Sequence, residues 1–144
     1  MKNENREHCK YIAEKLDRIV NGELFICPEC GEWISDDDGA VYDEMHDAIT
    51  CQHCNAEFNS DDAEPVSLYD YFDGDSIYNL EWRLDSNKEY KSVSIMVACG
   101  GPNIYIDTGS CQVELYWWGD NAEYPISYET RDAIDEFFSE LFNC

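Results

Sequence analysis

Two pairs of cysteines with CxxC spacing constrain the folding of this chain more than any other feature. The pairs are Cys27-Pro28-Glu29-Cys30 and Cys51-Gln52-His53-Cys54, and twenty residues separate them. Zinc prefers four soft or borderline ligands in a tetrahedron, and a CxxC turn brings two thiolates together without backbone strain. The spacing between the pairs is also typical of a ribbon-type site. The sequence therefore predicts one zinc ion per chain, bound by Cys27, Cys30, Cys51 and Cys54.

The residues beside each pair predict short hairpins. Gly31 follows the first pair and Asn55 the second, and both residue types tolerate the positive φ that turns backbone amides toward the sulfurs. Phe25-Ile26 leads into the first pair, and Glu57-Phe58 follows the second. We therefore expect each CxxC turn to cap a hairpin within a zinc-knuckle segment, residues 23–60.

Other uses of the two pairs are less consistent with the sequence. A redox CxxC opens a helix in a βαβ unit, and no such unit is visible. Disulfides need an oxidising compartment, whereas residues 1–18 carry charges throughout and lack the apolar stretch of a signal peptide. We therefore expect a cytoplasmic protein with reduced thiols. Four cysteines would close the metal shell, so the zinc is expected to be structural, although His46 or His53 could replace one thiolate.

The other four cysteines are scattered along the chain. Cys9 lies on the apolar stripe of a predicted helix and Cys99 ends a strand pattern, so we expect both in the core. The sequence assigns no role to Cys111 and Cys144.

The charge of the chain is strongly negative. Thirty-two Asp and Glu face nine Lys and Arg, which gives a formal net charge of −23. Residues 1–60 carry 5 basic and 14 acidic side chains, and residues 65–144 carry 4 and 15, so no basic patch can be drawn. Because nucleic-acid binding draws most of its affinity from Lys and Arg on phosphates, we expect no direct nucleic-acid binding and favour a basic protein as partner.

Two interpretations of this acidity remain open. The charge equals that of about 40 Å of duplex DNA, at one charge per roughly 1.7 Å, which permits DNA mimicry. Alternatively, it serves only solubility. The chain is not an acidic disordered tail, because 44% of its residues are hydrophobic and 14% aromatic. It also contains no transmembrane run, so no membrane contact is expected.

The hydrophobic pattern predicts an α+β fold. Residues 4–20 have helical periodicity, ended by Asn21-Gly22, and residues 128–142 have it again, with Ser127 as N-cap. Between them we expect a short helix at residues 42–48 and a polar connector at 60–65. Four strands are predicted, the last three joined by hairpin turns: residues 76–84, 90–98, 103–107 and 112–118.

Together these elements predict an N-terminal helix, a zinc-ribbon-like knuckle lobe, and an antiparallel meander sheet packed by a C-terminal helix. Val93, Ile95 and Val97 alternate with polar residues or Met96, so we expect one face of the sheet in the core. The corresponding segments are residues 1–22, 23–60 and 65–144, which we expect to form one compact unit with a zinc lobe.

Two short patterns suggest other chemistry but fit poorly. Asp107-Thr108-Gly109 resembles the active-site strand of aspartic proteases, yet it occurs once and suits a hairpin turn equally well. The acidic run Asp70, Asp73 and Asp75 does not match the EF-hand register. No phosphate-binding Gly-rich loop, nucleophile elbow or HExxH motif is present, so we expect that the protein is not an enzyme.

Aromatic residues are dense around Tyr116-Trp117-Trp118. Adjacent strand residues face opposite sides, so one tryptophan is expected to pack inward and the other to lie outside. An exposed Trp among acidic residues suits a protein interface, while cover from flanking helices is the alternative.

The whole layout resembles zinc-containing anti-CRISPR proteins, small acidic proteins of bacterial mobile elements. The resemblance is carried by the two CxxC pairs, by Val97-Ala98-Cys99-Gly100-Gly101-Pro102-Asn103-Ile104-Tyr105-Ile106-Asp107 and by Leu115-Tyr116-Trp117-Trp118-Gly119-Asp120. It implies a stoichiometric inhibitor that binds a type II CRISPR RNA-guided nuclease and interferes with its guide or target nucleic acid. It implies no catalytic residue. The alternative is a zinc-ribbon accessory module of a mobile element that binds a basic replication or transcription protein.

Overall fold

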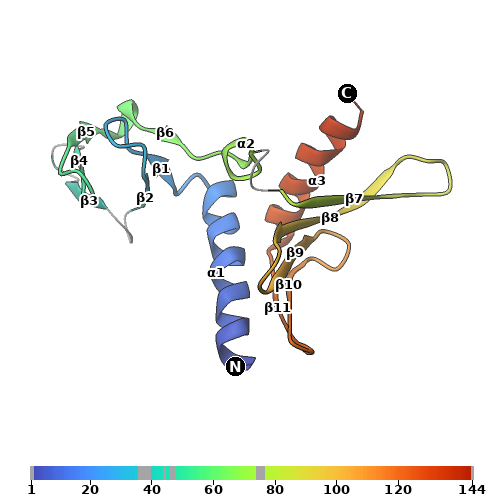
Figure 1. The fold of residues 1–144 in the computed structure, drawn as a ribbon. Coiled ribbons are helices and arrows are strands. Elements are labelled where there is room, and N and C mark those ends of the chain that lie inside the picture. Colours follow the sequence, from blue (N-terminus) through green and yellow to red (C-terminus); the bar gives the residue numbers. More distant parts are fainter. Residues whose placement is uncertain (1, 36–39, 44, 46–47, 74–76, 144) are drawn as a thin grey trace. The chain divides into compact units, whose positions relative to one another are not determined.

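The computed structural model describes residues 2–35, 40–43, 45, 48–73 and 77–143, and it has the predicted α+β fold (Figure 1). The chain divides into two compact units. The larger unit combines Met1–Val20 with Leu68–Cys144, and the smaller unit is Asn21–Ser67. The N-terminal helix therefore shares a core with the second half of the chain, while the CxxC pairs lie in a separate unit.

A five-stranded antiparallel sheet forms the centre of the larger unit, in the order β11-β10-β9-β8-β7. Its strands follow one another in the chain: β7 (Asn79–Leu84), β8 (Tyr90–Ala98), β9 (Asn103–Asp107), β10 (Gln112–Trp117) and β11 (Asp120–Pro125). The predicted meander is confirmed, and β11 adds a strand that was not predicted. The composition of β11, with Asp, Asn, Glu and Pro, is poor for a strand, so its pairing with β10 decides its conformation.

Three helices belong to the same unit. They are α1 (Lys2–Val20), the short α2 (Leu68–Tyr71) and α3 (Tyr128–Phe142). Gly22 follows α1 at a φ of 73°, the left-handed conformation common after a helix end. The Ser127 side chain accepts a hydrogen bond from the Thr130 N–H, which confirms it as the N-cap of α3.

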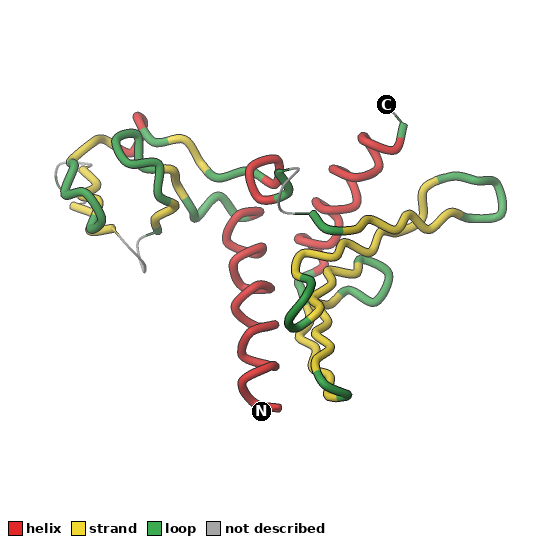
Figure 2. The backbone as a smooth tube through the Cα atoms, in the orientation of Figure 1, coloured by secondary structure: helices red, strands yellow, loops and turns green. Residues whose placement is uncertain are grey.

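Helices α1 and α3 cover one face of the sheet, and Figure 2 shows both alongside the strands. The buried sheet residues of this core are Val93, Ile95, Ile104, Ile106, Val113 and Leu115. The buried helix residues are Cys9, Ile12, Ala13, Leu16, Ile134 and Phe138. Val97 was expected among them but is only half-buried, because β8 carries an irregularity between Met96 and Ala98 that interrupts the alternation.

The smaller unit consists of two small antiparallel sheets. One has the order β2-β1-β6, from β1 (Phe25–Ile26), β2 (Trp33–Ile34) and β6 (Glu64–Pro65). The other has the order β3-β4-β5, from β3 (Ala40–Asp43), β4 (Ala48–Cys51) and β5 (Glu57–Asn59). A 3-10 turn, Ser60–Asp62, leads from β5 toward β6.

Two predictions about this unit were wrong. The expected helix at 42–48 is absent from the described residues there, since Tyr42 and Asp43 pair as strand with Ile49 and Ala48; Glu44, His46 and Asp47 lie outside the described residues. The expected connector at 60–65 is partly built into the sheet, because Glu64 and Pro65 pair with β1. β-branched and aromatic residues on β3 and β4 favour strand pairing over a local helix.

No described helix is both long and apolar enough to cross a membrane.

Candidate metal centre

The two CxxC pairs converge on one point, as predicted. The Sγ atoms of Cys27, Cys30, Cys51 and Cys54 all lie within 4.8 Å of one another. Two of the distances, Cys27 to Cys54 and Cys30 to Cys51, are 3.7 Å. A tetrahedron with metal–sulfur bonds of about 2.3 Å has edges of about 3.8 Å, whereas a disulfide needs sulfurs about 2.05 Å apart. The four thiols therefore form a cluster that fits a metal ion and not a pair of disulfides.

Each pair sits in a turn of the same geometry. In the first, the Gly31 N–H donates to the Cys27 carbonyl at 2.9 Å and the Cys27 N–H donates to the Glu32 carbonyl at 2.9 Å. In the second, the Asn55 N–H donates to the Cys51 carbonyl at 2.8 Å and the Cys51 N–H donates to the Ala56 carbonyl at 2.9 Å. The repeated pattern identifies two equivalent zinc-ribbon-like knuckles.

Gly31 and Asn55 occupy corresponding places in the two knuckles. Their φ angles are 77° and 62°, in the left-handed region that the sequence predicted for them. Each knuckle joins two paired strands: β1 with β2, and β4 with β5. The predicted hairpins are confirmed, and the strands hold the two turns so that their thiols meet.

Within each pair, one sulfur faces inward and the other outward. Cys27 and Cys51 are buried, while Cys30 and Cys54 are exposed. The two buried cysteines pack in a small core with Ile34 and Ile49, bordered by Phe25 and Phe58. The metal site is therefore part of the core of the smaller unit.

The pKa values of Cys27 and Cys30 are shifted in opposite directions. Burial raises the pKa of Cys27, but hydrogen bonds from the amides of Cys30 and Glu29 and from neighbouring thiols outweigh it and bring that pKa to about 7. A backbone hydrogen bond from Glu32 lowers the pKa of Cys30, yet partial loss of hydration around the sulfur and the neighbouring thiols together raise it to about 12. One thiolate therefore forms readily beside neighbouring sulfurs that oppose a second, and a bound cation would offset that repulsion.

The remaining cysteines and histidines do not join this cluster among the described residues. His53 lies exposed in the second knuckle, while His46 and Cys144 are outside the described residues. Cys9 is buried as predicted, but Cys99 is exposed because β8 ends at Ala98, before it. The Cys111 thiol donates to the Ile126 carbonyl at 3.3 Å.

Asp107 belongs to the short sequence that resembles the active-site strand of aspartic proteases. In the structure, its carboxylate is hydrogen-bonded within the larger unit. Both of its carboxylate oxygens accept hydrogen bonds from the Arg83 guanidinium, at 2.8 Å each. One oxygen also accepts from the N–H groups of Gly109 and Ser110, at 2.8 and 3.2 Å. Burial raises the pKa of Asp107, but these hydrogen bonds outweigh it and the net shift is downward. The carboxylate therefore closes the turn after β9.

The sequence did not identify the role of Arg83 or of Glu114. A buried Glu114 oxygen has no hydrogen-bond partner among the described residues. Burial, followed by the negative charge of Asp107, raises the pKa of Glu114. The strands β9 and β10 were predicted from the sequence, but their alignment with the neighbouring strands, which sets these contacts, was not.

The structure describes the two adjacent tryptophans and some of the acidic residues in the turns. Trp117 is half-buried and Trp118 is exposed, so one lies inward and the other outward as expected, but Trp118 lies in the turn after β10 and not on the strand predicted to reach it. Asp61, Asp62 and Glu64 are exposed in the smaller unit, while Asp36, Asp37, Asp38 and Asp75 lie outside the described residues.

Comparison of the chain with protein-family models, with curated proteins and with solved structures finds no match.

Proposed function

We propose that this protein is a stoichiometric inhibitor that binds a basic nucleic-acid-handling protein, and that its target is a type II CRISPR RNA-guided nuclease. The observation that carries the proposal is the net charge of −23 on a chain of 144 residues. Such a surface repels nucleic acid and attracts the Lys- and Arg-rich channels that bind it. Occupying such a channel blocks the guide or the target without any catalytic step.

Exposed acidic side chains occur on both units. The smaller unit presents Asp61, Asp62 and Glu64, and the larger unit presents Glu81 and Glu123. Either unit can therefore meet a basic partner.

We infer that the metal at the four cysteines is zinc and that it is structural. An all-thiolate set of four at tetrahedral spacing is a typical zinc site. Four protein ligands leave no position for water or substrate, so the ion stabilises the smaller unit and takes no part in chemistry.

The test is a DNA-cleavage assay with a purified type II nuclease, with the protein added before or after the guide RNA. We expect cleavage to fall to a plateau at equimolar protein and the two proteins to co-elute on gel filtration. Full cleavage at a large molar excess, without co-elution, would contradict the proposal.

Salt and charge provide the controls for this assay. As ionic strength rises from about 0.1 M to 1 M, the Debye length falls from about 10 Å to 3 Å and binding should weaken. Reversing Asp61, Asp62 and Glu64 to Lys should weaken it further if the smaller unit is in contact. Replacing the same three residues with Asn or Gln separates lost attraction from new repulsion.

The knuckle lobe favours one second candidate, an accessory module of a mobile element that binds a replication or transcription protein. That candidate predicts binding to a purified replication initiator or RNA polymerase and no effect on the nuclease. The same gel-filtration experiment, run with each protein in turn, separates the two functions.

A further inference from the structure

One face of the five-stranded sheet carries no helix among the described residues of the larger unit. The contacts of α1 and α3 are with the opposite face, where Arg6 of α1 lies over the Tyr124 ring at 4.9 Å and Phe138 of α3 packs on Trp82. Strand alternation places six residues used below on the uncovered side, here called the open face: Arg83, Tyr105, Asp107, Glu114, Tyr116 and Glu123.

The charge on the open face is negative and incompletely paired. Arg83 supplies a positive charge, but its guanidinium is engaged by both oxygens of Asp107. Glu114 of β10 lies directly opposite Glu123 of β11, an arrangement of like charges that destabilises a sheet. The Gln112 amide donates to Glu123 at 2.9 Å, while one Glu114 oxygen stays buried without a partner among the described residues. A cation bound at the exposed Glu123 would offset the repulsion between the two carboxylates.

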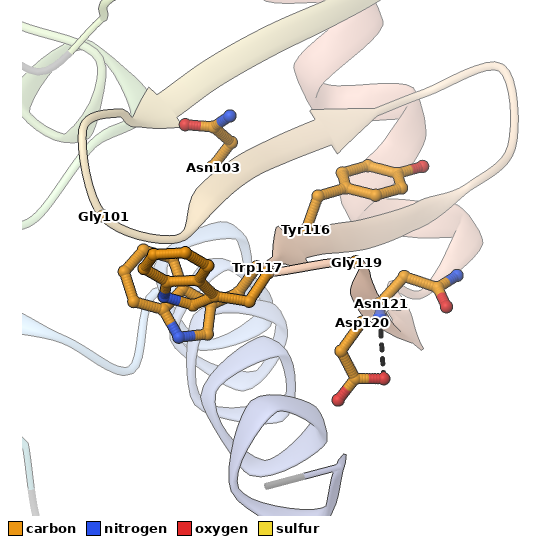
Figure 3. A pocket seen from close by; sticks show the side chains of 8 residues that line it. Gly101, Asn103, Tyr116, Trp117, Gly119, Asp120 and Asn121 are labelled. Carbon is orange, nitrogen blue, oxygen red and sulfur yellow. Dashed lines mark hydrogen bonds between the residues drawn. The ribbon is translucent and has the colours of Figure 1, made fainter.

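Aromatic side chains border these carboxylates. The Tyr105 and Tyr116 rings meet edge to face at 5.9 Å on the open face. Trp118 follows at the tip of the β10–β11 hairpin and is 82% exposed. Figure 3 shows Tyr116 and Trp117 pointing in different directions from neighbouring positions of β10, with Asn103 on the adjacent strand. The open face therefore presents the Tyr105 and Tyr116 rings beside the Glu114 and Glu123 carboxylates, and the exposed Trp118 lies at the end of the same hairpin, against the Trp117 ring.

Trp118 occupies an unfavourable position for its residue type. Trp118 and Gly119 form the two-residue turn between Trp117 and Asp120, with φ of 51° and 77°. Both positions of such a turn require positive φ, and Asn-Gly is the preferred pair. A bulky residue at positive φ is sterically disfavoured, and burial does not compensate because the indole is exposed. The indole contacts the Trp117 ring at 5.5 Å but remains 82% exposed, so burial contributes little to the fold at this position.

We propose that the open face, with Trp118 at its rim, is a docking surface for an arginine-bearing segment of a basic protein. A guanidinium can stack on an aromatic ring and donate two parallel hydrogen bonds to a carboxylate. The chain already uses both interactions internally, in Arg131 over the Tyr128 ring at 5.2 Å and in the Arg83–Asp107 pair. The inference rests on the proposed function to the extent that both require a basic protein partner.

The experiment uses the metal-loaded full chain, labelled with nitrogen-15, and a blocked Arg-Gly-Arg-Gly-Arg peptide at about 0.15 M salt. We expect the indole N–H signal of Trp118 to shift saturably, while those of Trp33 and Trp82 stay in place. The matched lysine peptide should bind about two- to fivefold more weakly, because ammonium groups stack less well on rings. Equal shifts of all indole signals, or equal affinity for both peptides, would overturn the proposal.

Variants localise the site. Trp118→Asn suits the turn and Glu123→Gln keeps the side-chain shape, and each should bind the arginine peptide about two- to fivefold more weakly. Glu140→Gln, at an exposed position of α3, is the matched control and should bind as wild type does. Wild-type affinity in both open-face variants would overturn the proposal, as would a dimer that Trp118→Asn dissociates, since the occupant would then be a second copy.

The experiments can contradict the proposed function and the proposed docking surface independently of each other. If the nuclease is inhibited equally by wild type, Trp118→Asn and Glu123→Gln, the docking surface is wrong and the proposed function stands. If the arginine peptide binds at Trp118 but no nuclease is inhibited, the proposed target is wrong and the docking surface stands.

Discussion

The Asp107 carboxylate links two strands and a turn through a few directional bonds. It is 5% exposed and paired with Arg83 across the sheet. A Cβ at Gly109 would lie 2.7 Å from the Arg83 guanidinium and 3.1 Å from Asp107, so a side chain there would have to displace the guanidinium from its position on the carboxylate. These contacts assign Asp107 a structural part in the larger unit.

We predict that Asp107→Asn lowers the free energy of unfolding by about 1–3 kcal/mol, because the amide keeps the shape but leaves Arg83 with a weaker acceptor. Urea denaturation at neutral pH measures the change. Glu81→Gln is the control, since Glu81 lies 3.9 Å from the same guanidinium at 69% side-chain exposure and should cost less than about 0.5 kcal/mol. Equal effects of the two substitutions would contradict the assigned role.

Replacement of Glu114 is expected to raise the free energy of unfolding, whereas replacement of Asp107 lowers it. Its pKa is raised in the folded protein from an ordinary value of 4.5, so its ionised form opposes folding at neutral pH. Glu114→Gln should therefore stabilise the protein by about 0.2–1 kcal/mol at pH 7, the range for cross-strand charge pairs. The gain should shrink as pH falls through the folded pKa and disappear below the unfolded pKa, where both states bind the proton. A gain that is independent of pH in urea denaturation would contradict this explanation.

At the scale of elements, the knuckle turns and the β10–β11 turn place different residue types at positive φ. The knuckle turns use Gly31 and Asn55 at positive φ, residue types suited to that conformation. The β10–β11 turn places Trp118 there instead, at 82% exposure. The first kind positions the four candidate metal ligands, and the second lies beside the docking surface that we propose.

We predict that Trp118→Asn stabilises the larger unit by about 1 kcal/mol, because asparagine tolerates the left-handed conformation. Trp118→Val is the contrasting variant and should destabilise it, since β-branched residues are strongly disfavoured at positive φ. Thermal denaturation of the two variants beside wild type measures both effects. Lower stability in Trp118→Asn would show that the indole contributes to the fold through its 5.5 Å contact with Trp117.

At the scale of the whole molecule, the two units differ in how they are stabilised. The larger unit has an extended apolar core from the sheet and the helices. The buried core of the smaller unit comprises Cys27, Ile34, Ile49 and Cys51, of which two are candidate metal ligands. Units of this size with small cores usually need a metal or disulfides.

We predict that Cys27→Ser with Cys30→Ser, or removal of the metal by a chelator, unfolds the smaller unit and leaves the larger unit folded, because metal binding and folding are coupled. Elemental analysis should find one zinc per wild-type chain and none in the double variant. Amide exchange should show protection lost in residues 21–67 and kept in β8 and β9. Cys99→Ser, at an exposed cysteine outside the cluster, is the control and should retain the metal. Loss of protection in both units together would contradict this division.

The metal ligands were predictable from the sequence because the information is local. A CxxC turn needs two thiols at fixed spacing and a follower that tolerates positive φ, and Cys27, Cys30 and Gly31 meet those conditions within five residues. The same holds for α1, α3 and the Ser127 cap, whose periodicity and capping are local. The helix expected at 42–48 failed because pairing between β3 and β4 outweighed the local pattern.

The sequence by itself determined which cysteines could bind a metal, the two long helices, the four strands from β7 to β10, and the sign of the net charge. Only the tertiary structure decided that β11 is a strand, that Arg83 meets Asp107, and that Glu114 faces Glu123. The physical reason is range: capping and periodicity act within a few residues, whereas strand register joins residues distant in the chain and is set by the packing of a common core.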